Sequence, residues 1–277
     1  MNQTIAHSHL SRYGVLHFAG PDARAFLQGQ LSNDLALLTP SRPLLAGLHN
    51  PQGRVLALLR LWPDPQDEHG VLGALPGELL AAVMAQLRRF VLRSKLRIAD
   101  ATGSWQLHGH RDARGALHHA LRAAPPAGVT QSAPPGSDGS LALFDRSLDE
   151  PAWDALEVAA GLPEVVTATA GEFVAQMLNL DCVGGIAWDK GCYTGQEIIA
   201  RSHYRGQVKR RMRRYAAATD VPPAPNSNWT TQDGVAVRVV RSALGADGEC
   251  ELLGVAPLSA QSVDERPLPY ALPAASS

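Results

Sequence analysis

Residues 176–205 have the sequence QMLNLDCVGGIAWDKGCYTGQEIIARSHYR, the most informative stretch of this 277-residue chain. Thr194 and Glu197 stand at the spacing of a capping box directly before an apolar run, which predicts a helix that begins at Thr194. Cys192 would then lie just outside the helix N-terminus, close to Lys190. The positive end of the helix and the lysine both favour thiolate over thiol, so Cys192 is a candidate nucleophile, redox-sensitive group or transient soft-metal ligand.

The neighbours of Cys192 bear on this interpretation. The alternative is a small buried hydrophobic residue in a glycine-rich turn. Gly191 and Gly195 favour the functional interpretation, because glycines on both sides let the backbone approach a bound group. Cys182 and Cys250 lack these features, and we expect both to be structural.

Composition and charge exclude several classes of protein. A length of 277 residues predicts about two domains. Lys and Arg number 25 against 26 Asp and Glu, so no overall field draws the chain to nucleic acid or to an anionic membrane. Three cysteines without a CxxC pair exclude a disulfide framework and a self-sufficient zinc or iron–sulfur ligand set, and we predict no metal site. The N-terminus lacks a secretory pattern and no run reaches the ~18 apolar residues of a membrane span, so we expect a cytoplasmic protein.

The hydrophobic pattern alternates between strands and helices along most of the chain. Strands are predicted at 13–18, 55–59, 70–75, 95–100, 104–110 and 140–147, and helices at 20–31, 76–92, 112–124, 151–161 and 171–179. This alternation is typical of an α+β sandwich of ferredoxin-like type. After residue 205, short apolar runs such as 235–240 and 249–258 between turn residues predict a small β domain.

The motif KGCYTGQE at 190–197, with QMLNLDCVGGIAW before it and IIARSHYRGQVKR after it, resembles the signature of the YgfZ family. This family is the folate-binding branch of the superfamily that contains the glycine cleavage T-protein, an aminomethyltransferase. GPDARAFLQGQLSND at 20–34 and NPQGRVLALLRL at 50–61 resemble the N-terminal motifs of the family in the same order. The resemblance covers about residues 13–215. It implies a three-lobed α+β fold with ferredoxin-like lobes, a central tetrahydrofolate pocket and a small C-terminal β-barrel.

The resemblance also implies roles for individual residues. Cys192 would be the functional cysteine, and we pair it with Lys190 as the catalytic group. The loop around the thiol would be shaped by Gly191, Tyr193, Gly195, Gln196 and Glu197. The central pocket would be faced by Gln30, Asn33, Asn50, Gly53 and Arg54, and we also assign Glu157, Asn179 and Arg201 to the cofactor.

Two departures from the T-protein pattern concern carboxylates. Leu56 and Ala57 stand where the T-protein carries a paired aspartate, so the carboxylate associated with aminomethyl transfer is missing. Ala159 occupies the glutamate position of its R-x-E-x-G motif, whose carboxylate holds the pterin. Losing that partner leaves buried N–H donors unpaired at a cost of about 1–3 kcal/mol each. Either Glu157 or Glu164 replaces it or folate binds weakly; alternatively, Glu157 is only a solvated helix residue.

Residues 201–214 contain seven basic side chains and no acidic one. They are Arg201, Arg205, Lys209, Arg210, Arg211, Arg213 and Arg214. Such a patch suits an RNA backbone or the glutamate tail of a folate, since arginine binds both phosphate and carboxylate. The alternative is a strand with one solvated charged face, because no aromatic residues are interleaved for base stacking.

The resemblance to the YgfZ family implies a tetrahydrofolate-binding protein that acts in iron–sulfur cluster assembly or repair and indirectly in tRNA modification. Its partners would be iron–sulfur enzymes or cluster-assembly proteins. The alternatives are a folate-dependent aminomethyl or methyl transferase and an RNA-binding module that uses residues 201–214. Whether the chain catalyses a turnover reaction stays open. We expect residues 1–204 to form two interleaved lobes and residues 205–277 to form the barrel.

Overall fold

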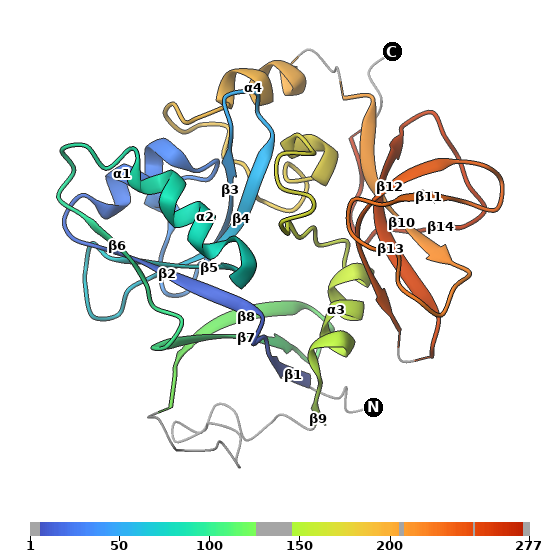
Figure 1. Ribbon diagram of the computed structural model, residues 1–277, viewed down its shortest axis with the longest axis horizontal. Coiled ribbons are helices and arrows are strands. Elements are labelled where there is room, and N and C mark those ends of the chain that lie inside the picture. The colour runs from blue at the N-terminus through green and yellow to red at the C-terminus, as the bar shows by residue number, and fades with distance from the viewer. Residues whose placement is uncertain (1–5, 126–145, 205–207, 246, 274–277) are drawn as a thin grey trace.

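The computed structural model describes residues 6–125, 146–204, 208–245 and 247–273. Their strands form three sheets, with the third sheet beside the other two (Figure 1). The predicted three-lobed α+β fold is therefore confirmed, whereas the number of domains stays a prediction. No helix in these ranges has both the length and the apolar character needed to cross a membrane.

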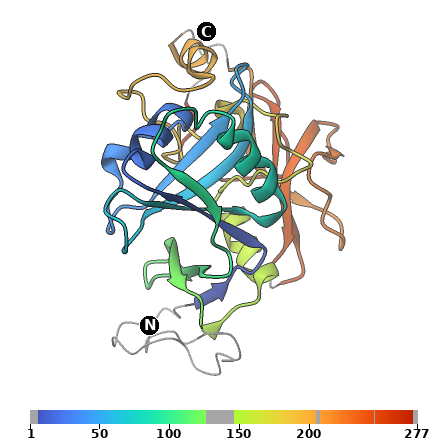
Figure 2. The same ribbon diagram turned by 60° about the vertical axis from the view of Figure 1, so that its left-hand side comes forward.

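The first sheet is antiparallel and has the strand order β3-β4-β5-β2-β6. Its strands are β2 (Tyr13–Ala19), β3 (Leu44–His49), β4 (Val55–Pro63), β5 (Val71–Pro76) and β6 (Arg97–Asp100). Two helices, α1 (Ala23–Gln30) and α2 (Gly77–Arg88), cover one face of it, and a short 3-10 turn η1 (Leu35–Leu37) follows α1 (Figure 2). The strand and helix predictions for residues 13–100 are confirmed, because each apolar run there is bounded by turn residues.

The second sheet has the strand order β8-β7-β1-β9. Its strands are β1 (Ala6–His9), β7 (Trp105–Arg111), β8 (Leu117–Ala123) and β9 (Arg146–Ser147). Helix α3 (Glu150–Ala159) packs on this sheet through Trp153, which is fully buried, and a Cβ on Gly109 would lie 2.3 Å from its indole ring. The predicted helix at 151–161 is thus confirmed. Most of the strand predicted at 140–147 lies outside the described residues.

The helix predicted at 112–124 is wrong, because residues 117–123 form strand β8. The Ala, Leu and Arg content of this segment favours a helix, but Leu117, His119 and Leu121 alternate with outward residues at the period of a strand. Antiparallel pairing with β7, in which Leu107 lies opposite Leu121, overrides the local preference.

The helix predicted at 171–179 is also wrong. Val174 is extended and pairs with Arg54 in an isolated bridge, and only the 3-10 turn η2 (Ala175–Leu178) follows. The Val55 N–H donates to the Phe173 carbonyl at 2.8 Å, so this segment is held along the start of β4 instead of coiling.

All described strands after residue 204 lie in the third sheet, whose order is β11-β12-β13-β10-β14. They are β10 (Arg210–Ala217), β11 (Asn228–Thr230), β12 (Ala236–Leu244), β13 (Cys250–Pro257) and β14 (Glu265–Arg266). β11 and β14 are the edges, and no pairing between them is found in the residues that the structure describes, so the predicted closed barrel is not seen. Met212, Val240 and Leu253 of this sheet share one core with the first sheet. The boundary at 204/205 stays a prediction.

The carboxylate of Glu157, on α3, joins the three sheets. It accepts hydrogen bonds from Arg60 of β4 at 2.9 Å, from Arg241 of β12 at 3.0 Å and from the His119 ring of β8, at 2.7 Å. Glu157 is fully buried, so the expectation of a solvated helix residue is wrong. Burial alone raises the pKa of this carboxyl, but Arg60 and Arg241 outweigh burial and hold it well below its usual value.

We predict that Glu157→Gln destabilises the fold by about 3–5 kcal/mol, because two buried arginines lose their counter-charge. Urea unfolding at pH 7 measures this, with the exposed Glu197→Gln as the control. The depressed pKa adds stability that is present above pH ~4.5 and is lost as the pH falls through the folded pKa, so wild-type stability should fall more steeply on acidification than that of Glu157→Gln. Equal free energies of unfolding for Glu157→Gln and Glu197→Gln at pH 7 would contradict the role of Glu157 in joining the sheets.

Candidate functional site

Cys192 is the accessible thiol among the cysteines. The three cysteines are free, and Cys192 is exposed whereas Cys182 is half-buried and Cys250 is buried. Burial and the neighbouring Asp181 raise the pKa of Cys182 to about 11, and burial also raises that of Cys250. Both are therefore held as thiols at neutral pH, as expected for structural cysteines.

Lys190 fixes the loop that carries Cys192. Its ammonium group donates to the carbonyls of Gln28 at 2.6 Å, Leu31 at 2.5 Å and Asn33 at 3.0 Å. These carbonyls lie at and just beyond the C-terminal end of α1, where a helix favours a cation. Burial lowers the pKa of Lys190 to about 8, which leaves the ammonium form predominant at pH 7.

Lys190 is thus a positioning residue of the loop. Its three N–H donors all meet carbonyls, and its Nζ lies 4.9 Å from the centre of the Tyr193 ring. The predicted catalytic pairing with Cys192 is not what this geometry shows. Gly191, between the two, is exposed. Gln30, the last residue of α1, is half-buried beside the carbonyls that Lys190 binds.

Helix α4 (Gln196–Tyr204) begins two residues later than predicted. The capping box is not formed, because Glu197 is 81% exposed and pairs with Arg201 at 2.6 Å instead of reaching back. Gln196 is the side chain that reaches back from the start of the helix, since its Oε1 accepts the Tyr193 N–H at 3.2 Å. Glu197 and Arg201 therefore form a surface ion pair, and their assignment to the cofactor has no support from this contact.

The turn at 50–54 packs against the start of α4. Asn50 accepts the N–H groups of Gln52 and Arg54 at 3.0 Å and so closes the turn. Gly53 (φ +71°) and Gly195 (φ +81°) both have left-handed conformations that favour glycine. A Cβ on Gly195 would lie 2.5 Å from the Asn50 carbonyl, so the two motifs meet at a distance that only glycine permits. The structure thus brings together Asn50, Gly53 and Gly195.

His49 is a residue of this site that sequence reasoning missed. It is 1% exposed, and its ring lies 6.1 Å from the ring of Tyr193, itself buried. Burial lowers the pKa of His49 to about 4, so the imidazole is neutral at pH 7. Its place beside the turn signal NPQG was the available clue, but a lone histidine at the end of a strand carries no motif.

Three predicted pocket residues are instead part of the framework. Asn33 donates to the carbonyls of Leu45 at 2.7 Å and Gly184 at 2.8 Å. Asn179 donates to the Met212 carbonyl at 2.8 Å and ties η2 to the third sheet. Glu157 joins the three sheets, as described above.

No carboxylate is free at the positions that correspond to the T-protein motifs. Leu56 and Ala57 lie in β4, and Ala159 is the last residue of α3. Glu164 is 8% exposed, accepts the Tyr13 hydroxyl and pairs with Arg12 at 3.1 Å. Since Glu157 is also buried and paired, neither glutamate stands ready to replace the missing pterin partner.

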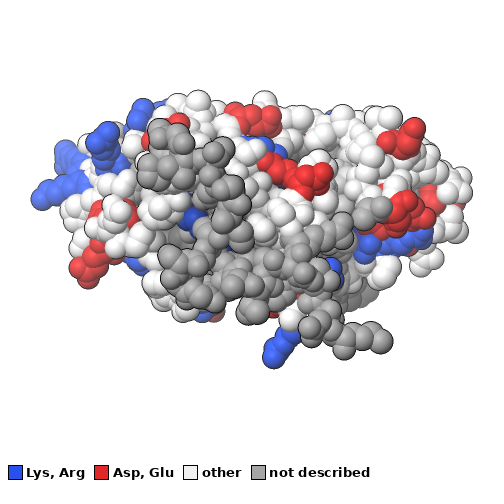
Figure 3. Space-filling view, turned by 90° about the horizontal axis from the view of Figure 1, so that it is seen from below, with Lys and Arg blue, Asp and Glu red and all other residues white. Residues whose placement is uncertain are grey.

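Most of the predicted basic run is neutralised. Arg211 pairs with Asp181, Arg213 with Glu265, and Arg214 with Glu251, each at 2.6–2.7 Å. Arg205 lies outside the described residues, while Lys209 and Arg210 are exposed. The described part of 201–214 therefore does not form one continuous basic patch, nor a strand with a simply solvated charged face. The face seen from below, away from α4, carries both signs of charge in separate small groups (Figure 3).

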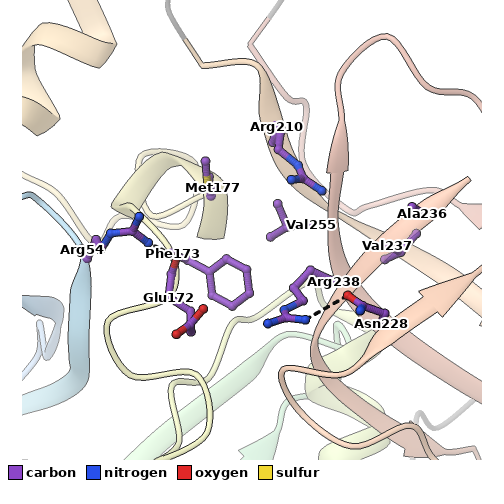
Figure 4. A pocket seen from close by; sticks show the side chains of 10 residues that line it. All are labelled: Arg54, Glu172, Phe173, Met177, Arg210, Asn228, Ala236, Val237, Arg238 and Val255. Atoms are coloured by element: carbon purple, nitrogen blue, oxygen red, sulfur yellow. Dashed lines mark hydrogen bonds between the residues drawn. The ribbon is translucent and has the colours of Figure 1, made fainter.

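A pocket of about 370 Å³ lies between residues 172–177 and the third sheet (Figure 4). Arg54, predicted to face a pocket, lines it together with Arg210 of the basic run. Arg238, Glu172 and the apolar lining were not singled out from the sequence, because only the folded chain brings β12 next to η2.

We predict that Lys190→Met destabilises the chain by about 2–4 kcal/mol, because buried carbonyls at the end of α1 lose their donor. Amide hydrogen exchange at residues 190–195 should rise at the same time, since the loop loses its anchor. Lys95→Met, at an exposed position, is the matched control. Unchanged exchange in the Lys190 variant would contradict the anchoring role.

Comparisons with known proteins agree with this fold. No protein-family model matches the chain. The tRNA-modifying protein YgfZ of Klebsiella pneumoniae is 29% identical over an alignment 305 positions long, which covers 95% of this chain and 92% of that protein. The protein of the same name from Colwellia psychrerythraea is 26% identical at the same coverage.

Among solved structures, the glycine cleavage system aminomethyltransferase T of Bartonella henselae superposes with a TM-score of 0.65 and 15% identity. It covers 93% of this chain and 80% of its own. At this identity the match concerns the fold alone. The resemblance to the YgfZ family is thereby confirmed over almost the whole chain, and the chain has the fold of the T-protein.

Proposed function

We propose that this chain is a tetrahydrofolate-binding protein that supports tRNA modification by maintaining iron–sulfur enzymes, with Cys192 as its reactive group. The observation that carries the proposal is the exposed thiol on a loop that Lys190 and the start of α4 hold in place. The curated relatives are named tRNA-modifying proteins, and the similarity extends over 95% of the chain. This supports a role close to tRNA modification.

The part played by the chain's own residues follows from the geometry of the loop. Lys190 and Gln196 fix its two ends, so that the Cys192 thiol is presented to solvent on a defined backbone. A presented thiol suits contact with another protein better than chemistry in a closed pocket. The partners would be cytoplasmic iron–sulfur enzymes or cluster-assembly proteins.

The fit to folate is partial. A reduced folate would supply one-carbon or redox chemistry when bound, and its pterin normally requires an acceptor for adjacent N–H groups. Glu157 and Glu164 do not fit that need, because both are buried and already paired. A folate on this chain must therefore be held by other groups. A T-protein-like transferase is disfavoured for the same reason.

A complementation experiment tests the role of Cys192. In a Klebsiella pneumoniae strain that lacks its own YgfZ, the wild-type chain should restore iron–sulfur enzyme activity and the modified nucleosides of tRNA, measured by mass spectrometry. Cys192→Ser should lose at least tenfold of that activity at equal expression, and Cys182→Ser serves as the control. Full restoration by Cys192→Ser would overturn the role of the thiol, and failure of the wild-type chain would overturn the functional proposal.

Folate binding is tested by anaerobic calorimetry with tetrahydrofolate kept reduced. Saturable binding at micromolar affinity is the expected result, and it would show that other groups replace the missing glutamate. Absence of binding at millimolar ligand would contradict the folate part of the proposal and leave the test of Cys192 intact.

A further inference from the structure

We propose that residues 88–97, which join α2 to β6, form a docking surface for a single-stranded stretch of RNA, bound through its phosphates and one unpaired base. The sequence of this basic segment is RRFVLRSKLR. It lies at the end of the molecule away from the third sheet (Figure 1). The inference rests on the basic segment itself and adds a partner to the proposed function without depending on it.

The basic segment carries five positive charges that no side chain cancels. No Asp or Glu occurs in the sequence between Glu78 and Asp100. All five cationic side chains are exposed, and none of them forms an ion pair with a described residue. They are Arg88, Arg89, Arg93, Lys95 and Arg97. The Asp22 carboxylate approaches the segment, but it accepts the backbone N–H of Lys95 at 2.6 Å and pairs with no described cation.

Other arginines of the chain are neutralised by carboxylates. Arg211 pairs with Asp181 at 2.7 Å, and Arg241 pairs with Glu157 and Asp154, at 3.0 and 2.9 Å. Those arginines serve the framework, whereas the cations of the basic segment keep their charge at an exposed edge. A local group of this kind attracts a polyanion even though the whole chain has a net charge of −1.

The backbone of the basic segment is held at both ends. Arg88 donates to the Ile98 carbonyl at 2.8 Å, which holds the end of α2 beside β6. The Lys95 carbonyl accepts the Asp22 N–H at 3.4 Å, and a Cβ on Gly20 would lie 2.6 Å from that carbonyl. The side chains between these anchors therefore project from a defined backbone, which lowers the entropy cost of binding a partner.

Phe90 lies among these cations and supplies a surface for stacking. Its ring is 43% exposed, so one part packs on the protein and the other part faces solvent. Its N–H donates to the Leu87 carbonyl at 3.0 Å, which continues the end of α2. Every base presents a flat π-face, so a half-exposed ring between cations can stack on any unpaired base. We therefore expect a preference for single-stranded over double-stranded RNA.

The small apolar area of the basic segment favours RNA over a protein or a membrane. Leu92 is 88% exposed, but it is the one apolar side chain of the segment that projects freely. A protein interface has a larger apolar centre, and an interfacial membrane helix buries a whole apolar face. Five cations, of which four are arginines, instead match the phosphate groups of RNA, because arginine binds phosphate through two parallel hydrogen bonds.

Fluorescence anisotropy with a labelled oligouridine of about 12 nucleotides, between ~25 and ~200 mM KCl, tests the phosphate contacts. The wild-type chain should bind saturably at the low-salt end. The double variant Arg89→Gln/Arg93→Gln should bind at least tenfold more weakly there, and the slope of log K against log salt should become shallower by about 1.4, or about 0.7 for each lost contact. Arg42→Gln/Arg114→Gln is the matched control, because both arginines are exposed and lie outside the basic segment.

The variant Phe90→Leu tests stacking, because it keeps apolar bulk and removes the ring. Its affinity for oligouridine should fall at least fivefold, with an unchanged salt slope and an unchanged affinity for an RNA duplex of the same length. Tyr204→Leu, at an exposed aromatic residue near the end of α4, is the control. Thermal melting verifies that each variant is folded.

Absence of oligouridine binding by the wild-type chain, or equal binding by the two double-arginine variants, would overturn the proposal. Binding to phosphatidylglycerol vesicles that requires Leu92, without binding of oligouridine, would assign the basic segment to a membrane and overturn it as well. Cys192→Ser should bind oligouridine as the wild type does. Failure of RNA binding therefore leaves the proposed function standing, and failure of the Cys192 test leaves RNA binding standing.

Discussion

A single buried carboxylate, Glu157, accepts hydrogen bonds from one side chain of each of the three sheets. Removing a charge of this kind from water costs several kcal/mol, and the cost is offset only when all partners are in place. The three sheets must therefore dock together, because any two of them leave the carboxylate or an arginine without its full set of partners. Removing one partner of such a junction is therefore strongly destabilising.

This use of the carboxylate has a functional consequence. Glu157 and Glu164 are the glutamates closest in sequence to the position at which the T-protein motif carries its own. Both are already paired, Glu157 with Arg60 and Glu164 with Arg12. The shared fold thus supports a different distribution of charge. Carboxylates pair with arginines where the sheets meet, whereas the arginines that line the pocket between the third sheet and η2 form no ion pair with any described residue.

Local patterns predicted much of the fold but little of the long-range pairing. The strands at 13–18 and 55–59 were predictable because apolar runs between turn residues have few other solutions. Residues 112–124 were not, since their helix-forming composition is overridden by pairing with β7. The surroundings of Glu157, Arg211, Arg213 and Arg214 were not predicted, because the partners of these side chains lie 30 or more residues away in the sequence.

In the candidate site, too, local motifs were predictable from the sequence and long-range contacts were not. A motif centred on Cys192 identified the loop. Gly191 and Gly195 were expected to let the backbone approach a bound group, whereas the structure shows that Gly195 approaches the Asn50 carbonyl. No sequence pattern indicated that Lys190 binds the carbonyls at the end of α1. Its position two residues before Cys192 suggested a contact with the thiol instead.

The turn at 50–54 lies between the start of α4 and the pocket beside the third sheet. On one side, Gly53 and the Asn50 carbonyl contact the start of α4, which follows the Cys192 loop. On the other side, Arg54 reaches into the pocket and is held there only by neutral carbonyls. The turn itself is closed by one side chain, because Asn50 accepts the N–H groups of both Gln52 and Arg54. The conformation of this short turn therefore fixes both the contact with α4 and the place from which Arg54 extends.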